Sequence, residues 1–298
     1  MPKITKKKLN IGHLSELSLI LHSIILSFFL LNNINNQMFA INFLPLVPMR
    51  AADSERSEMI SQLLYGETVT ILESTDRWLF VENTADQYRG WVDKKMLKLL
   101  DDQEYASILT HGVQTLYYPL LECENNNTFE KMYLPGGSRL YSFSNKVKTH
   151  TDVDMTFDPV LQIFPVEING ANILKIATMY LNAPYLWGGK SLLGIDCSGL
   201  VQVVFSICGI QLPRDASQQV EKGDLVNFLG EAQQGDLAFF DNEAGNITHV
   251  GILLDATRII HASGWVKIEK IDNHGIISSQ TGEYTHKLKV IKRLINSR

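Results

Sequence analysis

The pairing of one cysteine motif with two histidines on a single hairpin restricts the fold of this chain more than any other feature. Cys197 lies in the segment GIDCSG, which predicts a turn that opens into a helix. His249 and His261 bracket VGILLDATRII (250–260), an apolar run with one polar turn, and this pattern predicts a β-hairpin. If the turn is centred on Asp255, the two histidines lie directly opposite each other, about 4.5–5.5 Å apart at Cβ. A thiol at a helix start and two paired imidazoles are the components of an activated cysteine nucleophile.

These predicted positions suit the chemistry of a thiolate. A free thiol has a pKa of about 8.5 and is mostly protonated at neutral pH. The partial positive charge of a helix N-terminus favours the thiolate, and a protonated His249 beside Cys197 would form an ion pair with it. His261 would accept a proton from the far ring nitrogen of His249 and so fix its tautomer and ring plane. Asp196 can cap the helix, and the backbone N–H of Cys197 is a natural donor to an oxyanion.

Spacing alone leaves other roles open for the same residues. A buried cysteine is commonly an inert part of the core, and this is our interpretation of Cys123 and Cys208. One cysteine and two histidines can also bind zinc, but the sequence contains no Cys-x-x-Cys or His-x-x-x-His pair that would complete such a site. Three cysteines are an odd, small number that does not suggest a disulfide framework, so we expect all three to be thiols.

Length and charge limit the classes of protein that this chain can belong to. Its 298 residues, 45% of them hydrophobic, predict two or three domains with apolar cores. The net charge is −5, and no basic stripe appears beyond the N-terminus. Nucleic acid is therefore not an expected partner. The sequence indicates no cofactor and does not fix the oligomeric state.

The first 40 residues have the pattern of a targeting segment. A basic start is followed by LSLILHSIILSFFLL (17–31), an apolar stretch of 15 residues, and then by small and polar residues up to Ala40. Such a stretch is typical of a secretory signal and is too short for a comfortable membrane span. We therefore expect an exported protein, periplasmic or extracellular. An uncleaved N-terminal anchor and a cytoplasmic location are the alternatives.

Two β-rich segments are predicted after this region. Residues 45–99 contain short strands rich in β-branched and aromatic residues at 68–72, 78–82 and 90–92, which predict a small barrel. Residues 100–165 predict a second small barrel, with a turn at PGG (135–137) and candidate strands at 114–118, 131–134, 138–143 and 161–164.

The pattern changes to helices and then strands in residues 170–298. A helix is expected at 173–181, a second one starts at Cys197 and stops at Gly209, and a short third one begins near Arg214. The strand that follows residue 235, the histidine hairpin and the segment 288–294 then form an antiparallel sheet. Helices first and a sheet afterwards make an α+β domain.

A set of short motifs in this domain is more specific than the spacing of Cys197, His249 and His261 alone. In chain order they are YLWGG (185–189), DCSGLV (196–201), PRDA (213–216), GDL (235–237) followed by Phe240, THVGI (248–252) and HAS (261–263). With these motifs, residues 170–296 resemble the NlpC/p60 family of papain-like cysteine peptidases, which cleave bacterial cell-wall peptides. The resemblance implies that Cys197 is the nucleophile, His249 the general base and acid, and His261 the orienting residue.

The N-terminal half refines this resemblance. The segments SEM (57–59), QLLYGE (62–67) and YRGWV (88–92) are similar to the bacterial SH3-like domain of one subgroup of the family. That subgroup consists of γ-D-glutamyl-L-diamino-acid endopeptidases, also called dipeptidyl-peptidase VI. They release L-Ala-γ-D-Glu from murein peptides that have a free N-terminal L-Ala, because the first SH3-like domain closes one end of the cleft.

The resemblance also implies a set of substrate-binding residues, since an ammonium group needs carboxylates. The candidate carboxylates are Glu58, Asp196 and Asp215. Their candidate hydrogen-bond partners are Tyr88 and Ser198. Tyr185 and Trp187 are the candidate aromatic walls of the pocket. In intact wall the stem alanine is amidated, so recycling of free peptides is favoured over lysis. The alternatives are a wall-binding protein without activity and a hydrolase of polymeric wall. Whether diaminopimelate or lysine is preferred is left open.

Overall fold

The computed structural model describes residues 37–110, 113–125, 129–141, 155–156 and 167–295. The predicted targeting segment lies outside the described residues up to position 36. Its last residues belong to a strand instead, because Met38–Asn42 forms β1 and Ala40 is fully buried. The folded part therefore starts before residue 45, where the first barrel was expected. Within the described residues, no helix combines the length and the apolar character that a bilayer span requires.

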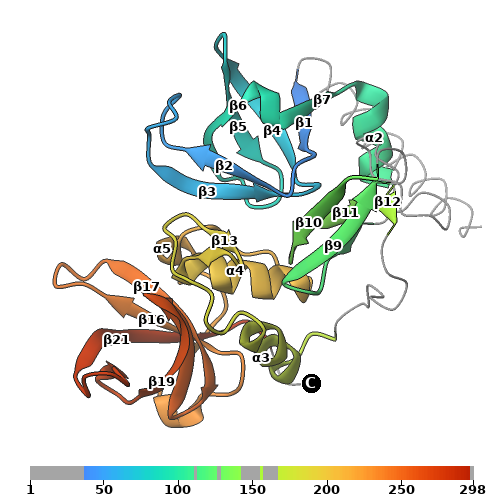
Figure 1. Cartoon of the computed structure of the whole chain (residues 1–298). Coiled ribbons are helices and arrows are strands. Elements are labelled where there is room, and N and C mark those ends of the chain that lie inside the picture. Colours follow the sequence, from blue (N-terminus) through green and yellow to red (C-terminus); the bar gives the residue numbers. More distant parts are fainter. Residues whose placement is uncertain (1–36, 111–112, 126–128, 142–154, 157–166, 296–298) are drawn as a thin grey trace, which may run out of the picture. The chain divides into compact units, whose positions relative to one another are not determined.

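The first β-rich segment forms a seven-stranded antiparallel sheet in the order β3-β2-β6-β5-β4-β1-β7 (Figure 1). The strands are β1 (Met38–Asn42), β2 (Leu46–Arg50), β3 (Met59–Leu64), β4 (Thr68–Ser74), β5 (Trp78–Asn83), β6 (Arg89–Asp93) and β7 (Leu97–Leu100), with a 3₁₀ turn at Lys94–Met96. The strands predicted at 68–72, 78–82 and 90–92 are confirmed by β4, β5 and β6. Alternate residues such as Val47 and Val81 fill one buried core.

The second β-rich segment contains a helix that the sequence analysis did not predict. Helix α2 (Asp102–Thr110) begins with a capping box, in which Glu104 N donates to Asp101 Oδ1 at 2.8 Å and Asp101 N donates to Glu104 Oε2 at 3.0 Å. The strands that follow are β8 (Val113–Thr115), β9 (Leu120–Asn125), β10 (Lys131–Pro135), β11 (Arg139–Tyr141) and β12 (Met155–Thr156). The strand predicted at 161–164 lies outside the described residues, so the second barrel stays a prediction.

Three helices open the C-terminal part of the chain: α3 (Gly170–Thr178), α4 (Cys197–Ile207) and α5 (Ala216–Gln219). A small pair of strands, β13 (Lys190–Ser191) and β14 (Gly194–Ile195), precedes α4. All residues of α4 are buried except Ser206, so this helix is an interior element and not an amphipathic surface one. The chain leaves α4 through Gly209 at a φ of +82°, a conformation that favours glycine.

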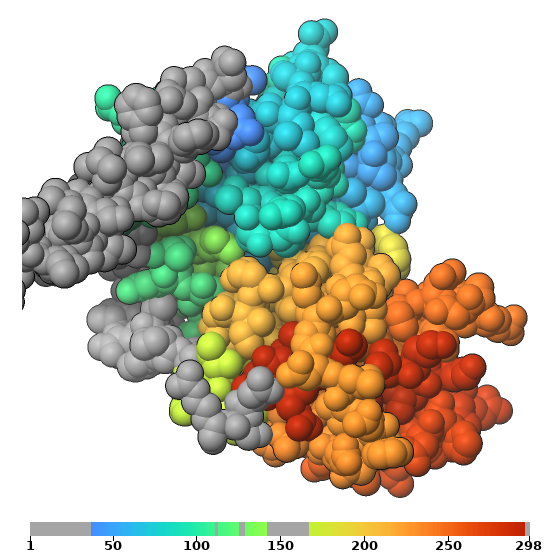
Figure 2. All heavy atoms as spheres, turned by 180° about the vertical axis from the view of Figure 1, so that it is seen from behind, coloured from blue at the N-terminus to red at the C-terminus, as the bar shows by residue number. Residues whose placement is uncertain are grey.

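The final sheet closes on itself. Its order is β15-β21-β16-β17-β18-β19-β20, and β20 also pairs with β21. The strands are β15 (Asp224–Val226), β16 (Leu237–Asp241), β17 (Ile247–Asp255), β18 (Arg258–Ser263), β19 (Trp265–Ile271), β20 (Gly275–Ile277) and β21 (Tyr284–Arg293), with a 3₁₀ turn at Leu229–Glu231. In the space-filling view the orange and red residues of these strands adjoin the yellow residues around α4 (Figure 2).

The two faces of these strands have different neighbours. Val250 and Ile252 belong to the same apolar cluster as Leu200 of α4. Leu253, which follows Ile252 and points to the other face, packs with Phe240 in a separate cluster inside the closed sheet. Successive side chains of a strand point to opposite faces, so His249 and Gly251 share the inner face with Leu253. The predicted order of helices followed by an antiparallel sheet is confirmed.

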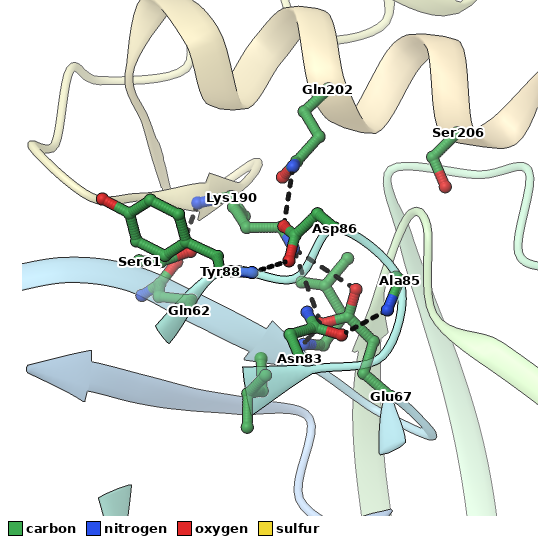
Figure 3. Close-up of polar contacts among 12 residues, drawn as sticks. Ser61, Gln62, Glu67, Asn83, Ala85, Asp86, Tyr88, Lys190, Gln202 and Ser206 are labelled. Carbon is green, nitrogen blue, oxygen red and sulfur yellow. Dashed lines mark hydrogen bonds and ion pairs between the residues drawn. The ribbon is translucent and has the colours of Figure 1, made fainter. Parts of the chain in front are cut away.

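A buried polar network joins the first barrel to the C-terminal part (Figure 3). Lys190 Nζ lies 3.3 Å from Glu67 Oε1, and both residues are at most 5% exposed. The backbone N–H of Lys190 donates to Gln62 Oε1 at 2.8 Å, and Gln202 Nε2 of α4 donates to Asp86 Oδ2 at 2.8 Å. Buried ions need such partners, because an isolated one loses its hydration without compensation. The network therefore fixes the barrel against the helix that carries Cys197.

We expect Lys190→Met to lower the free energy of unfolding by about 3–5 kcal/mol, because it leaves the buried Glu67 carboxylate without its cation. Adding Glu67→Gln should recover part of this loss, since the amide keeps an acceptor for the backbone N–H of Leu64 and carries no charge. Lys131→Met, which breaks an exposed ion pair with Glu122, is the matched control and should change little. Urea denaturation measures all four proteins. A double variant as unstable as Lys190→Met alone would contradict this account.

Candidate active site

Cys197 is the first residue of α4, as the sequence predicted. The preceding Asp196 caps the helix, with its Oδ1 accepting from Gly199 N at 2.7 Å. The sulfur receives hydrogen bonds from the backbone N–H groups of Ser198 and Val250, and Val250 directly follows His249 in β17. The thiol therefore lies at the helix N-terminus and against the strand that carries the proposed base.

Burial opposes the thiolate that we expected from the helix dipole. Cys197 is only 7% exposed, and burial, together with the charge of Asp196, raises the pKa of its thiol to about 11. Burial likewise lowers the pKa of His249 well below its usual value, and repulsion from His286 and His261 in their protonated forms acts in the same direction. Both groups are neutral at pH 7 in this state. The arrangement therefore suits proton transfer to His249 during the attack and not a preformed ion pair.

The hairpin register differs from the predicted one. The turn falls at Ala256 and Thr257 and not on Asp255, and a bulge between Leu253 and Asp255 shifts the register by one residue, so His261 pairs with Gly251. His249 is therefore not directly opposite His261. His249 lies two residues before Gly251 in β17, on the same face of the sheet. Diagonal neighbours of this kind remain within reach of long side chains. His249 Nε2 and His261 Nδ1 are accordingly 3.0 Å apart, although the prediction of directly opposed residues was wrong.

Gly251 explains how the diagonal contact is possible. A Cβ at this position would lie 2.9 Å from His261 Cβ and 2.6 Å from Ile259 Cδ1, both shorter than normal contacts. The absence of a side chain lets the His261 ring pass over Gly251 toward His249. This residue lies in the THVGI motif, but its role was not recognised from the sequence.

Two further residues of the site were missed. Glu269 of β19 is 3% exposed, and its Oε2 lies 2.9 Å from His261 Nε2. His286 of β21 stacks on His249 with ring centroids 4.1 Å apart and an interplanar angle of 28°. Burial lowers the pKa of His286 to about 4, so its ring is neutral at pH 7.

The three imidazoles also form the one group of possible metal ligands found among the described residues. One ring nitrogen from each of His249, His261 and His286 lies within 4.8 Å of the others. Histidine nitrogens are common ligands of zinc. However, His249 Nε2 and His261 Nδ1 already bond each other at 3.0 Å, so neither nitrogen is free for a metal ion. The arrangement fits a hydrogen-bond relay better than a preformed metal site.

A cavity of about 500 Å³ opens beside Cys197 and is lined from two parts of the chain. Six of the seven predicted substrate-binding residues line it, namely Glu58, Tyr88, Trp187, Asp196, Ser198 and Asp215. Tyr185 is not among the lining residues. Its hydroxyl is nevertheless influenced by the same site, since burial and the charges of Cys197 and Asp196 raise its pKa to about 12.

Asp196 has a different role from the one predicted for an ammonium ligand. Both of its oxygens bond the guanidinium of Arg214, at 3.0 Å from Nη1 and 2.5 Å from Nη2. Oδ1 also accepts from Gly199 N, and Oδ2 accepts from Gly188 N at 2.8 Å. Its charge and its hydrogen-bonding capacity are therefore already used. Arg214, only 1% exposed, was not recognised from the sequence as part of the site.

The other two carboxylates keep free capacity. Trp187 Nε1 donates to Glu58 Oε1 at 2.6 Å, and Tyr88 O–H donates to Asp215 Oδ1 at 3.2 Å. Both bonds connect the first barrel with the C-terminal part. Burial raises the pKa of Asp215 above its ordinary value, while Arg214 and the Tyr88 hydroxyl act against the rise. The cavity thus carries negative charge from Glu58 and Asp215.

Comparisons with known proteins agree with this arrangement of residues. A model of the NlpC/P60 family matches residues 182–287, and a model of the bacterial dipeptidyl-peptidase SH3 domain matches residues 49–97. The chain carries an NlpC/P60 peptidase domain. The NlpC/P60 match and the SH3 match confirm the predicted resemblance, the α+β fold class and the assignment as a cysteine peptidase.

Some relatives match this chain over most of its length. Dipeptidyl-peptidase 6 of Lysinibacillus sphaericus is 27% identical over 248 residues, which cover 76% of this chain and 88% of the relative. A γ-D-glutamyl-L-lysine dipeptidyl-peptidase of Bacillus cereus is 26% identical over 260 residues, or 76% of this chain and 74% of that one. The crystal structure of an NlpC/P60 family protein from Bacillus cereus ATCC 10987 shares the fold, with a TM-score of 0.73 and 20% identity, over 87% of this chain and 100% of that chain.

We expect Gly251→Ala to reduce kcat by about 10- to 100-fold, because the new methyl group displaces His261 from His249 and small displacements in a site carry such costs. Overpacking should also lower stability by about 1–3 kcal/mol. Gly230→Ala is the control, since Gly230 has open space around its Cα and an ordinary backbone. Peptide hydrolysis and thermal melting measure both effects. Full activity of Gly251→Ala would show that the His261 ring reaches His249 without the space that Gly251 leaves.

Proposed function

We propose that this NlpC/P60 peptidase hydrolyses the bond between γ-D-Glu and the diamino acid in murein peptides with a free N-terminal L-Ala. The observation that carries the proposal is the cavity at Cys197, which the barrel and the peptidase domain line together. The names of the two relatives, dipeptidyl-peptidase 6 and γ-D-glutamyl-L-lysine dipeptidyl-peptidase, support the same reaction. The product would be the dipeptide L-Ala-γ-D-Glu.

The charges of the cavity suit the N-terminal ammonium of such a peptide. Because Arg214 neutralises Asp196, the negative field of the cavity comes from Glu58 and Asp215, which both line it. An ammonium group between two carboxylates forms charge-assisted hydrogen bonds, which are about twice as strong as neutral ones. Trp187 and Tyr88 hold these carboxylates in place through their own hydrogen bonds. A peptide blocked at this amine has no charge to offer and needs additional room.

The proposed catalytic residues account for the chemistry. His249 takes the thiol proton as the sulfur of Cys197 attacks the γ-carbonyl carbon of D-Glu. The backbone N–H groups at the start of α4, where the helix dipole is positive, stabilise the oxyanion of the tetrahedral intermediate. His249 then gives its proton to the leaving amine of the diamino acid. Water hydrolyses the thioester by the reverse route, and the dipeptide leaves with Cys197 restored.

The proposal also covers the organisation and location of the chain. We propose two SH3-like domains at 45–99 and 100–165 before the peptidase domain at 170–298, the first of them starting earlier at β1. The basic and apolar pattern of residues 1–31 supports export. The proposed substrate is a free peptide and not intact wall, since stem alanine in the wall is amidated and offers no ammonium group.

We expect the protein to cleave L-Ala-γ-D-Glu-L-Lys and L-Ala-γ-D-Glu-diaminopimelate, and to leave their N-acetylated forms intact. Glu58→Gln and Asp215→Asn should each raise KM by about 10- to 100-fold, because a hydrogen bond to a charged group contributes about 1.5–3 kcal/mol. Their kcat should change little, since the carboxylates bind ground state and transition state alike. Product analysis by mass spectrometry follows each reaction.

Two controls separate the alternatives. Glu73→Gln removes an exposed carboxylate of the same barrel that does not line the cavity, and should behave as wild type. Cys197→Ala should abolish cleavage. A wild-type protein that binds wall but cleaves neither peptide, with binding unchanged in Cys197→Ala, would point to a wall-binding protein. Equal cleavage of free and acetylated peptides, or clearing of purified sacculi in a zymogram, would indicate a broader wall hydrolase.

A further inference from the structure

We propose that Glu269 is a positioning residue that determines which nitrogen of His249 is free to accept the thiol proton. It acts through His261 and touches neither the substrate nor the sulfur. The inference rests on the proposed function only in so far as His249 is the general base. The inference states which atom donates and which accepts in the hydrogen bonds from His249 through His261 to Glu269. The protonated nitrogen of each ring can be measured without any substrate.

The contacts of Glu269 define where this chain ends. Its Oε2 lies 2.9 Å from His261 Nε2. Its Oε1 accepts from the backbone N–H of Ser279 at 2.8 Å and from the Ser279 hydroxyl at 3.0 Å, and Lys267 Nζ lies 3.5 Å from the same oxygen. These neighbours hold the carboxylate in one orientation. Burial alone would raise the pKa of Glu269, but the hydrogen bonds from His261 and Ser279 lower it to about 2, so the carboxylate is charged.

An ionised carboxylate can only accept hydrogen bonds, and this fixes the tautomer of His261. The proton of His261 must reside on Nε2 to fill the 2.9 Å contact. Burial lowers the pKa of His261 despite the opposing effect of Glu269, so the ring carries one proton and not two. Nδ1 of His261 is therefore an acceptor, in the manner of buried carboxylate–histidine pairs.

The same reasoning carries the effect to His249. Because Nδ1 of His261 is an acceptor, the 3.0 Å contact requires a proton on Nε2 of His249. His249 is also neutral, so its Nδ1 keeps a lone pair, and this nitrogen is the one left for the thiol of Cys197. With the opposite tautomer, Nδ1 would carry a proton and could not act as a base. One buried carboxylate thus sets both rings in the catalytically competent form.

Glu269→Gln is the sharpest test, because the surroundings dictate how the amide must lie. The backbone N–H of Ser279 and the ammonium of Lys267 can only donate, so they require the amide oxygen on their side. The amide NH₂ then faces His261 Nε2 and donates to it. The proton of His261 moves to Nδ1, that of His249 moves to Nδ1 in turn, and the base is blocked although every heavy atom keeps its place.

We expect Glu269→Gln to lower kcat by about 10²- to 10⁴-fold, the range in which a triad with the wrong histidine tautomer operates, with KM within about twofold of wild type. Long-range ¹H–¹⁵N spectra of the imidazoles supply the readout that a merely structural role would not move. In wild type they should show both His249 and His261 protonated at Nε2, and in Glu269→Gln both protonated at Nδ1. Glu283→Gln, an exposed carboxylate on the loop before β21, is the matched control and should match wild type in both measurements.

The outcomes are distinguishable from failure of the proposed function. If the wild-type protein cleaves neither tripeptide, the positions of the protons on the His249 and His261 rings still test the inference. A wild-type spectrum with His249 protonated at Nδ1, or a Glu269→Gln variant with wild-type kcat, would overturn it. If the variant does not fold, as judged by thermal melting, the wild-type spectrum provides the decision on its own.

Discussion

The buried ion pair between Asp196 and Arg214 is the interaction on which the rest of the site depends. Asp196 ends the turn before α4, so its carboxylate caps the helix whose first residue is Cys197, and Arg214 holds that carboxylate from the other side. The guanidinium also donates to Ser61 of the first barrel and to Ser198. Desolvation makes such a pair costly unless every donor and acceptor is satisfied, and here the planar fork of arginine meets that condition. One pair therefore connects the nucleophile, its helix and the neighbouring barrel.

The same pair decides which charges the cavity presents. The sequence motifs offer three carboxylates to an ammonium group, but one of them, Asp196, is already paired with Arg214. The two that remain, Glu58 and Asp215, come from different parts of the chain and face the cavity only because the barrel is fixed in place. Specificity for a free amine is thus a property of the assembled domains. The buried Lys190–Glu67 pair, remote from the sulfur, contributes to it by holding the same interface.

Site residues that belong to a recognisable motif can be predicted from the sequence. Site residues whose role depends on how the strands pair cannot. The cysteine helix, the histidine hairpin and the barrel strands follow from local patterns and were predicted. Glu269 was not, because the alternation of β19 favours Ile268 as the buried residue, whereas Ile268 is 36% exposed and Glu269 is inside. Gly251 lies opposite His261 because the turn falls at Ala256 and Thr257 and a bulge then shifts the register by one residue, and no local signal marks that bulge. Arg214 lay inside a recognised motif, but its partner is known only once the turn and the helix are placed together.

Burial explains why a chain of buried polar groups is needed behind a simple thiol. Desolvation keeps both Cys197 and His249 uncharged, which protects the resting site but removes the electrostatic activation that a surface pair would have. The proton must then move when the carbonyl is attacked, and the imidazolium so formed must be stabilised inside the closed sheet. His261 accepts from that ring, and the charge of Glu269 lies one hydrogen bond further on. Because the carboxylate is ionised in the resting state, the negative charge that balances the transient imidazolium is already in place before the reaction begins.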